Sequence, residues 1–250
     1  LAGCGAPSPS ASDVKVTDVD HTPVKRQSIG NCWLYAQATW LESLLKTTEG
    51  TDTNISESYW TWWHWHDQLI ASNRDEITTG GWWRESVRIL NRYGYVLESE
   101  FIAEESVEEM SMRQSEALSY MNAQLAEGGA LADPVMRTPE NIRMHLDLAF
   151  RVNMAEAQTL ARQSYDVLLT MPNGQVTTIQ EALIGSHLTR WNRTYFPRLY
   201  GEGAIATPDI VAQRQNIFRR VMRALNDRFP VVISLMIDFN ALDRNDETFK

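Results

Sequence analysis

The sequence predicts a fold of the α+β class, with helices first along the chain and strands after them. Up to about residue 183, apolar residues recur mostly at three-to-four spacings, which is the pattern of amphipathic helices. Residues 229–238 read FPVVISLMID, and such a β-branched run is typical of a buried strand. A single strand cannot satisfy its own backbone hydrogen bonds, so we expect partner strands further on.

Length and composition limit the function classes. The chain has 250 residues, enough for one large domain or two modest ones with a full core and no disulfide. Its formal charge of -9 argues against a nucleic-acid binder that uses a basic patch. The sequence contains no apolar run long enough for a transmembrane helix. Six of the nine tryptophans fall between Trp60 and Trp83, which predicts an aromatic core, with a carbohydrate or ligand platform as the alternative.

Residues 1–20 form the first predicted segment. They begin Leu-Ala-Gly-Cys and continue with a tract of proline, serine and alanine that has the composition of a flexible linker. The tetrapeptide resembles the lipobox of bacterial lipoproteins. This resemblance implies that Cys4 carries diacylglycerol, that residues 1–3 are a signal-peptide remnant, and that the protein is anchored at the bacterial cell envelope, in the outer membrane or at the periplasmic face. The alternatives are a disulfide between Cys4 and Cys32 and a chance match in a tail.

Residues 21–105 are predicted to form a compact helical half. Its first helix begins at Cys32 and ends at a Glu-Gly pair, its second is capped by Ser56, and its third stops at Gly94. The residues expected to face inward are Leu34, Ala38, Leu41 and Leu45 in the first helix, Tyr59, Trp62, Trp63, His66, Leu69 and Ile70 in the second, and Val87, Leu90 and Tyr93 in the third.

Residues 106–206 are predicted to be a helical insertion followed by an irregular connecting segment. The expected helix signals are a capping box at Ser106 with an end at Gly128-Gly129, a start at Thr138-Pro139, and a start at Asn153 with a stop at Pro172-Asn-Gly. These helices contain no histidine, cysteine or carboxylate that forms a metal-ligand or acid/base set. We therefore interpret the stretch as one that covers or gates something.

Residues 207–250 are predicted to start a β half. Thr207-Pro208 opens a helix, and the strand over residues 229–238 follows it. The residues expected to face inward from this helix are Ile210, Ile217, Phe218, Val221 and Leu225. The sequence then stops at Lys250, about a dozen residues after the predicted strand.

Residues 27–36, QSIGNCWLYA, place Cys32 in the first turn of a predicted helix. Backbone N–H groups point outward at a helix start, and the helix dipole there favours thiolate over thiol. A nucleophilic sulfur needs this environment. A structural cysteine is the alternative that the position alone leaves open.

Three landmarks then occur in the order found in papain-like cysteine peptidases. QSIGNCWLYA resembles the active-site segment of that family and is closest to the bleomycin hydrolase and aminopeptidase C branch. Residues 54–59, NISESY, resemble the start of the family's next helix, and Gly80-Gly81 followed by residues 87–96 resembles its Gly-Gly, helix and Tyr-Gly segment. The resemblance implies a papain-like fold with a helical left half, a helical insertion, and a β half that is incomplete in this chain.

The resemblance also implies a role for each site residue. Cys32 is the nucleophile, and Gln27 forms the oxyanion hole together with the Cys32 backbone N–H. Gly80 and Gly81 bind the backbone of an extended peptide or protein substrate at close approach. Trp33 lies in the core behind the nucleophile. The gap from Gln27 to Cys32 is one residue shorter than is usual in the family, and neither a metal nor a cofactor is implied.

The catalytic base is missing from the expected place. The family's histidine and asparagine follow the strand that residues 229–238 resemble, and no histidine follows it here. The thiolate–imidazolium pair requires that histidine. We therefore expect the catalytic His and Asn to come from sequence or a second chain beyond Lys250. The alternatives are a catalytically inactive module and a rearranged site that uses His187 with Asn192.

The expected function is hydrolysis of peptide bonds through a thiolate and an acyl-enzyme, by a lipid-anchored cysteine peptidase. The alternative is an inactive papain-like module that keeps the cleft and Gly80-Gly81 to bind peptides or a protein partner. A peptidoglycan amidase of the same superfamily also suits an envelope lipoprotein, but those enzymes favour Asp-Cys-Ser where this chain has Asn-Cys-Trp. Whether cleavage is at chain ends or internal stays open.

Overall fold

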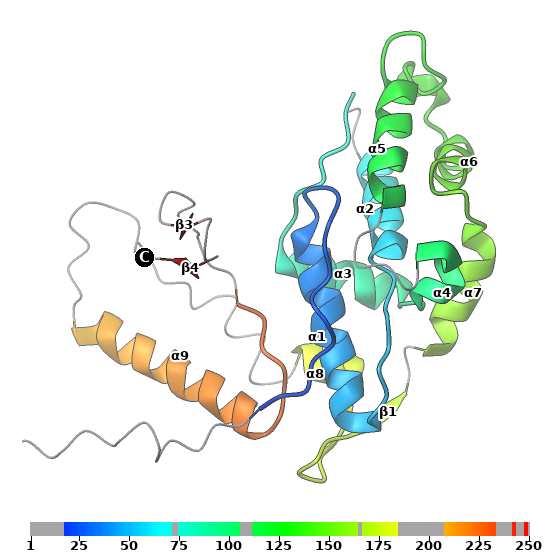
Figure 1. Cartoon of the computed structure of the whole chain (residues 1–250). Coiled ribbons are helices and arrows are strands. Elements are labelled where there is room, and N and C mark those ends of the chain that lie inside the picture. Colours follow the sequence, from blue (N-terminus) through cyan, green and yellow to red (C-terminus); the bar gives the residue numbers. More distant parts are fainter. Residues whose placement is uncertain are drawn as a thin grey trace, which may run out of the picture.

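The computed structural model describes residues 18–71, 75–105, 112–164, 167–184, 208–233, 242–243 and 248–249. Within these ranges the chain is mainly helical, with two small antiparallel sheets of two strands each (Figure 1). This arrangement is a helix-rich form of the predicted α+β class. None of the helices in these ranges is long and apolar enough to cross a membrane.

The first half of the helical body contains three helices whose ends are as predicted. Its helices are α1 (Cys32–Glu49), α2 (Glu57–Ala71), α3 (Trp83–Tyr93) and the short α4 (Glu98–Phe101), with a 3₁₀ turn at Ala103–Glu105. Helix α1 ends at Gly50 and α3 at Gly94, where positive φ angles of 70° and 68° suit glycine. The Ser56 hydroxyl caps α2 by accepting a hydrogen bond from the Tyr59 N–H at 3.1 Å.

Helix α2 is the centre of the core and is buried on nearly every side. Trp60, Trp62, Trp63 and Trp65 are each at most 1% exposed. The predicted single inward face is therefore wrong, and Ile70, which it includes, is 46% exposed. The reason is that α1, α3, α5 and α6 all pack against α2, so its successive residues each meet a neighbour. The prediction of an aromatic core is confirmed.

The second half of the body consists of helices that pack on α2 or α3. They are α5 (Met112–Leu125), α6 (Pro139–Phe150) and α7 (Met154–Ser164), with a 3₁₀ turn at Pro134–Met136. The start of α6 is as predicted, with the Thr138 hydroxyl accepting from the Asn141 N–H at 3.3 Å and Pro139 in the first turn. The predicted capping box at Ser106 lies outside the described residues.

The predicted helix from Asn153 to Pro172 is too long. Helix α7 ends at Ser164, and the Pro172-Asn-Gly turn instead joins two antiparallel strands, β1 (Leu168–Thr170) and β2 (Val176–Thr178), which α8 (Ile179–Ile184) follows. Asn-Gly favours a tight hairpin turn, and its glycine adopts a φ of 83°. The central pair of the hairpin, Leu169 and Thr177, is buried, so alternation along the strands outweighs helical spacing here.

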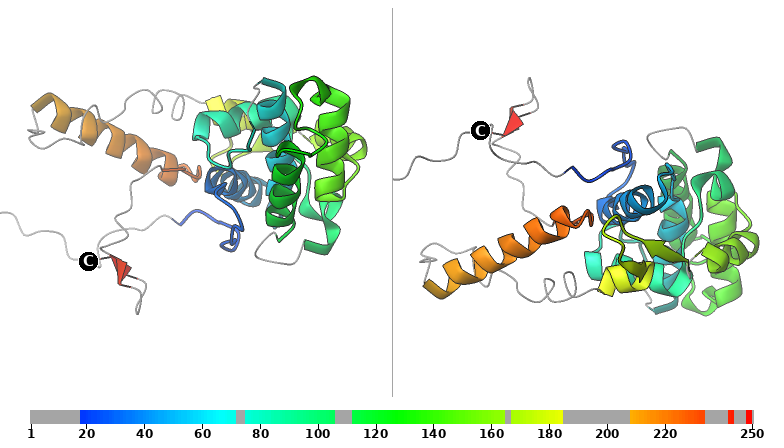
Figure 2. Two further views of the ribbon diagram at one scale, coloured as in Figure 1. Left: turned by 90° about the horizontal axis from the view of Figure 1, so that it is seen from above. Right: turned by 90° about the horizontal axis from the view of Figure 1, so that it is seen from below.

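Helix α9 (Pro208–Asn226) begins where the sequence predicts and extends away from the helical body (Figure 2). Its carboxyl end is held against α1, where the Trp40 indole N–H donates to the Pro230 carbonyl at 3.0 Å and Ala224 is buried. The prediction that Phe218 faces inward is wrong, because its side chain is 66% exposed. Phe218 lies nearly two turns before Ala224, the buried residue at this end of the helix.

The prediction of a strand over residues 229–238 is wrong for those residues of the range that the structure describes. Residues 229–233 belong to no strand, and residues 234–238 lie outside the described ranges. The Phe229 N–H instead closes the end of α9 by donating to the Ala224 carbonyl at 2.9 Å, and Pro230 has no N–H to offer to a sheet. The described strands of this region are β3 (Leu242–Asp243) and β4 (Thr248–Phe249), an antiparallel pair.

Candidate active site

Cys32 is the first residue of α1, as predicted, and its thiol is exposed to solvent. The preceding residue, Asn31, is the N-cap, and its carbonyl accepts a hydrogen bond from the Leu34 N–H at 2.9 Å. The first turn of an 18-residue helix therefore carries the sulfur toward solvent. A nucleophile in this position can be reached by a substrate.

The segment of residues 79–81, which we call the glycine ledge, lies against the start of α1. The Trp33 indole N–H donates to the Thr79 carbonyl at 3.0 Å. A Cβ atom on Gly81 would lie only 2.4 Å from the Trp33 ring, and one on Gly30 would lie 2.7 Å from the Thr79 hydroxyl oxygen. Glycine at both positions lets the two segments touch. The structure thus places the chain around Cys32 next to Gly80 and Gly81, which are about 48 residues away in sequence.

The two glycines of the ledge face different surroundings. Gly80 is exposed, and a Cβ atom there would meet nothing within 4 Å. Gly81 is half-buried against the indole of Trp33, which itself is only 8% exposed. The prediction that Trp33 lies in the core is confirmed. Gly80 is therefore the glycine of the ledge that faces solvent.

His64 packs behind the ledge. Its ring lies edge-on to the ring of Trp33, with 4.8 Å between the ring centroids, and its side chain is buried. Burial lowers the pKa of His64, although the charge of Glu85 and hydrogen bonds to the backbone of Thr78 and Gly80 oppose the shift. A neutral, buried ring is suited to holding Trp33 and the ledge together, and not to exchanging protons with a substrate.

The remaining predicted site residues are not brought into one catalytic set by the described chain. Gln27 is exposed, and its role as an oxyanion donor stays a prediction. Within the described ranges, no histidine hydrogen-bonds the Cys32 thiol, and no group of three histidine, cysteine or acidic side chains is arranged to hold a metal ion. Cys4, His187 and Asn192 lie outside those ranges.

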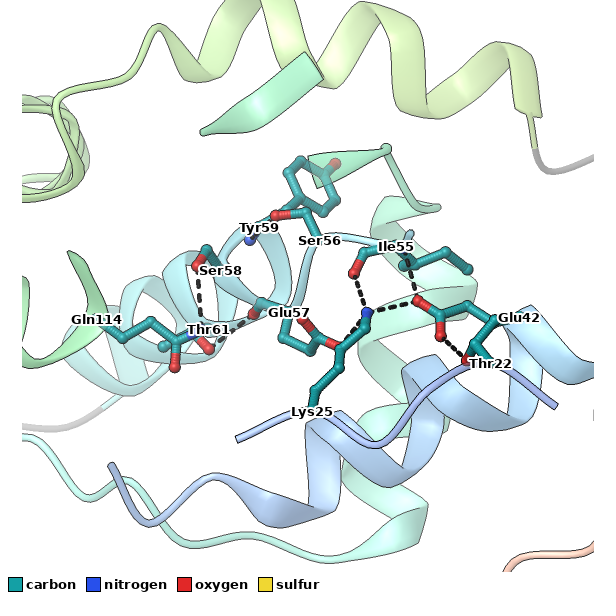
Figure 3. A network of polar contacts seen from close by, with 10 residues as sticks. All are labelled: Thr22, Lys25, Glu42, Ile55, Ser56, Glu57, Ser58, Tyr59, Thr61 and Gln114. Carbon is teal, nitrogen blue, oxygen red and sulfur yellow. Dashed lines mark hydrogen bonds and ion pairs between the residues drawn. The ribbon is translucent and has the colours of Figure 1, made fainter. Parts of the chain in front are cut away.

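The segment of residues 22–25, which precedes the site, is fixed by a buried ion cluster (Figure 3). Lys25 Nζ lies 2.6 Å from Glu42 Oε1 on α1 and 2.9 Å from Glu57 Oε1 on α2. The Thr22 hydroxyl donates to the second oxygen of Glu42 at 2.5 Å, and the Ile55 N–H donates to the first at 2.7 Å. Residues 22–25 are thereby tied to both helices just before Gln27. We call this set the Lys25 cluster.

Carboxylates around this cluster titrate in an unusual range. Burial raises the pKa of Glu57 to about 7, with the charge of Lys25 opposing the shift and that of Glu42 adding to it. Burial likewise raises the pKa of Glu98 to about 8, and the charge of Glu57 contributes. One oxygen of Glu98 is buried without a hydrogen-bond partner. The charged form of Glu98 is therefore costly to the folded protein.

Residue patterns missed one member of this site. The side chain of Asn31, next to Cys32, is 1% exposed and points inward, where its amide donates to Thr61 on α2 and Gln114 on α5. The sequence signal was only the Gly-Asn pair before the cysteine, and such a pair does not indicate its partners.

No protein-family model matches the chain, and no curated protein matches it. The arrangement offers a solvent-facing thiol beside an open stretch of backbone, which is suited to covalent attack on an extended ligand.

We expect Gly81→Ala and Gly80→Ala to differ sharply. The added methyl of Gly81→Ala meets the Trp33 ring and must displace it or the ledge, so the variant should lose about 1–3 kcal/mol of stability. Gly80→Ala adds the same methyl to open space and should unfold within about 0.5 kcal/mol of the wild type. Urea unfolding followed by tryptophan fluorescence measures both. Equal losses would contradict the close contact between Trp33 and Gly81.

Glu98→Gln should stabilise the protein at alkaline pH. Because the folded-state pKa of about 8 exceeds the ordinary value of 4.5, the folded protein binds this proton more tightly, and stability is lost as the pH rises from about 4.5 to about 8. Removing the charge should recover about 1–2 kcal/mol at pH 8.5 and little at pH 5. Thermal unfolding at both pH values tests this, with Glu127→Gln on the exposed surface as the matched control. A gain that is the same at both pH values would refute the assignment.

Proposed function

We propose that this chain carries the nucleophile of a papain-like cysteine peptidase at the bacterial cell envelope. The observation that supports it most is the joining of Cys32 to the glycine ledge through Trp33, whose indole N–H bonds the Thr79 carbonyl. Two motifs that resemble the family separately in the sequence are thus neighbours in space. Cys32, which precedes Trp33, and Gly80, which follows Thr79, are both exposed to solvent.

The proposed chemistry is acyl transfer through sulfur. The Cys32 thiolate attacks the carbonyl carbon of the scissile peptide, forming a C–S bond and an oxyanion that the Cys32 N–H and the Gln27 amide stabilise. Collapse of this intermediate breaks the C–N bond, and the leaving amine takes a proton from a histidine. Water then hydrolyses the thioester and restores the thiol. In this proposal the histidine and its asparagine partner come from sequence or a second chain beyond Lys250.

Among the clustered tryptophans, those of α2 and those beside the ledge differ in exposure. The tryptophans of α2 are buried in the core and offer no stacking surface. Trp82, directly after the ledge, is 76% exposed. A peptide extended along Gly80 could place an apolar side chain against this indole. The same surface would serve an inactive module that binds peptides, so the reactivity of Cys32 decides between the two functions.

An epoxysuccinyl probe directed at thiols tests the nucleophile. In the full-length protein, with any partner chain present, Cys32 should react about a hundredfold faster than the same residue in urea-unfolded protein, because a paired histidine keeps the sulfur ionised and oriented. Mass spectrometry locates the label, and Cys32→Ser is the control that should abolish it. A Cys32 that is no more reactive than a free thiol would refute the peptidase proposal. Peptide binding retained in that case would favour the inactive module.

The envelope anchor is tested separately at Cys4. Mass spectrometry of protein extracted from membranes should find diacylglycerol on this residue, and Cys4→Ser should release the protein into the soluble fraction. Cys32→Ser is the matched control, since it removes the other thiol and should leave the protein in the membrane. An unmodified Cys4 in membrane-extracted protein would end the lipoprotein proposal without affecting the peptidase proposal.

A further inference from the structure

Asn31, the residue before Cys32, lies at the centre of a buried chain of hydrogen bonds. Its Nδ2 lies 2.9 Å from the Thr61 hydroxyl oxygen and 2.8 Å from Oε1 of Gln114. Nε2 of Gln114 in turn lies 3.0 Å from the Ser58 hydroxyl oxygen. Thr61, Gln114 and Ser58 are all fully buried. The chain therefore joins α5 to the first residue outside α1 by way of side chains that water does not reach.

The direction of each hydrogen bond is fixed by its neighbours. The Thr61 hydroxyl gives its hydrogen to the Glu57 carbonyl at 2.8 Å, so toward Asn31 it can only accept. Gln114 uses Nε2 for Ser58, so its Oε1 faces Asn31. Both amide hydrogens of Asn31 are consequently used, while its Oδ1 is buried without a partner. With Gln114 in this orientation, turning the Asn31 amide over would set this oxygen against the oxygens of Gln114 and Thr61, which holds the Asn31 side chain in the orientation described.

The locked side chain belongs to the residue on which the first turn of α1 rests. The Asn31 carbonyl accepts the Leu34 N–H, and Cys32 follows Asn31 directly. The anchored Asn31 side chain therefore restrains the backbone that carries the thiol. Gln114 supplies one of only two acceptors for the Asn31 amide among the described residues.

We propose that Gln114 is a positioning residue for Cys32, so that helix α5 influences the reactivity of the thiol through the side chain of Asn31. The inference rests on the proposed nucleophilic role of Cys32. It assigns a catalytic consequence to a stretch that the sequence marks only as an insertion. Loss of the Gln114 acceptor leaves a buried N–H of Asn31 unpaired, which favours reorientation of Asn31 and loosening of the first turn.

The test compares three variants of the full-length protein. Gln114→Met keeps the shape and removes both hydrogen bonds, whereas Gln114→Glu keeps an acceptor toward Asn31. Gln124→Met makes the same chemical change about 15 Å further along α5 and serves as the matched control. For each variant, alkylation of Cys32 by iodoacetamide is followed from pH 5 to pH 9 on the Cys32 peptide, alongside Tm and the kcat and KM for peptide hydrolysis.

Gln114→Met should slow alkylation and lower kcat by about tenfold or more with little change in KM, because a misplaced nucleophile costs rate and not binding. Its alkylation profile should also move to higher pH, while Gln124→Met stays close to the wild type. Gln114→Glu should stay closer to the wild type than Gln114→Met, because its buried carboxyl mimics the amide when protonated. A lower Tm for Gln114→Met with an unchanged alkylation profile would overturn the proposal, since a purely structural role moves Tm alone. A wild-type Cys32 that reacts like a free thiol would instead refute the proposed function on which it rests.

Discussion

The contact of Lys25 with two buried carboxylates is the interaction on which the arrangement of the site depends. Glu42 comes from α1 and Glu57 from α2, and neither has another cation within ion-pair distance among the described residues. Removing the lysine charge would leave two buried carboxylates facing each other, and breaking a buried pair in this way costs about 3–5 kcal/mol. The segment before Gln27 is thus bound to both helices by an interaction whose loss would strongly destabilise the protein. The chain from Lys25 to Cys32 therefore begins at a residue whose position is fixed.

The core and the site share residues, so neither can change alone. Trp33 packs on His64 with its ring, bonds Thr79 with its N–H, and follows Cys32 directly in the chain. His64 lies on α2, whose tryptophans fill the centre of the molecule. A shift in the packing of α2 would therefore reach the glycine ledge through two side-chain contacts. This coupling explains why glycine is required at position 81, where the ledge meets the indole.

Sequence patterns were most reliable where the cause of a structure is local. The starts and ends of the helices at Ser56, Gly94 and Thr138 depend on caps formed within a few residues, and all of these are as predicted. The hairpin around Pro172 was missed because an apolar spacing that fits a helix was given more weight than the Asn-Gly turn. The predicted strand from Phe229 failed in its described part because that residue serves to close α9.

The candidate site was predictable only in part, for a related reason. An exposed Cys32 at a helix start follows from local signals and is observed. Its neighbour across the site, the glycine ledge, could be expected only from resemblance, because it is distant in sequence. The contact between Asn31 and Gln114 spans 83 positions and leaves no periodic trace. Polar residues in helices are ordinarily expected to face water, and Gln114 is fully buried.

The burial of α5 and α6 also decides how this part of the molecule could regulate the site. The sequence suggests a stretch that covers or gates something, and a gate in the usual sense swings open. Here Met121, Ile142, Leu146 and Phe150 are fully buried in the same core as α2, and exposing each such side chain costs about 1.5–3 kcal/mol. A swing that uncovered all four would consume a large part of the stability of an ordinary domain. Any influence of α5 on Cys32 must therefore act through small displacements within a closed core. The hydrogen bond between Gln114 and Asn31 is a direct contact through which a displacement of α5 would reach the start of α1.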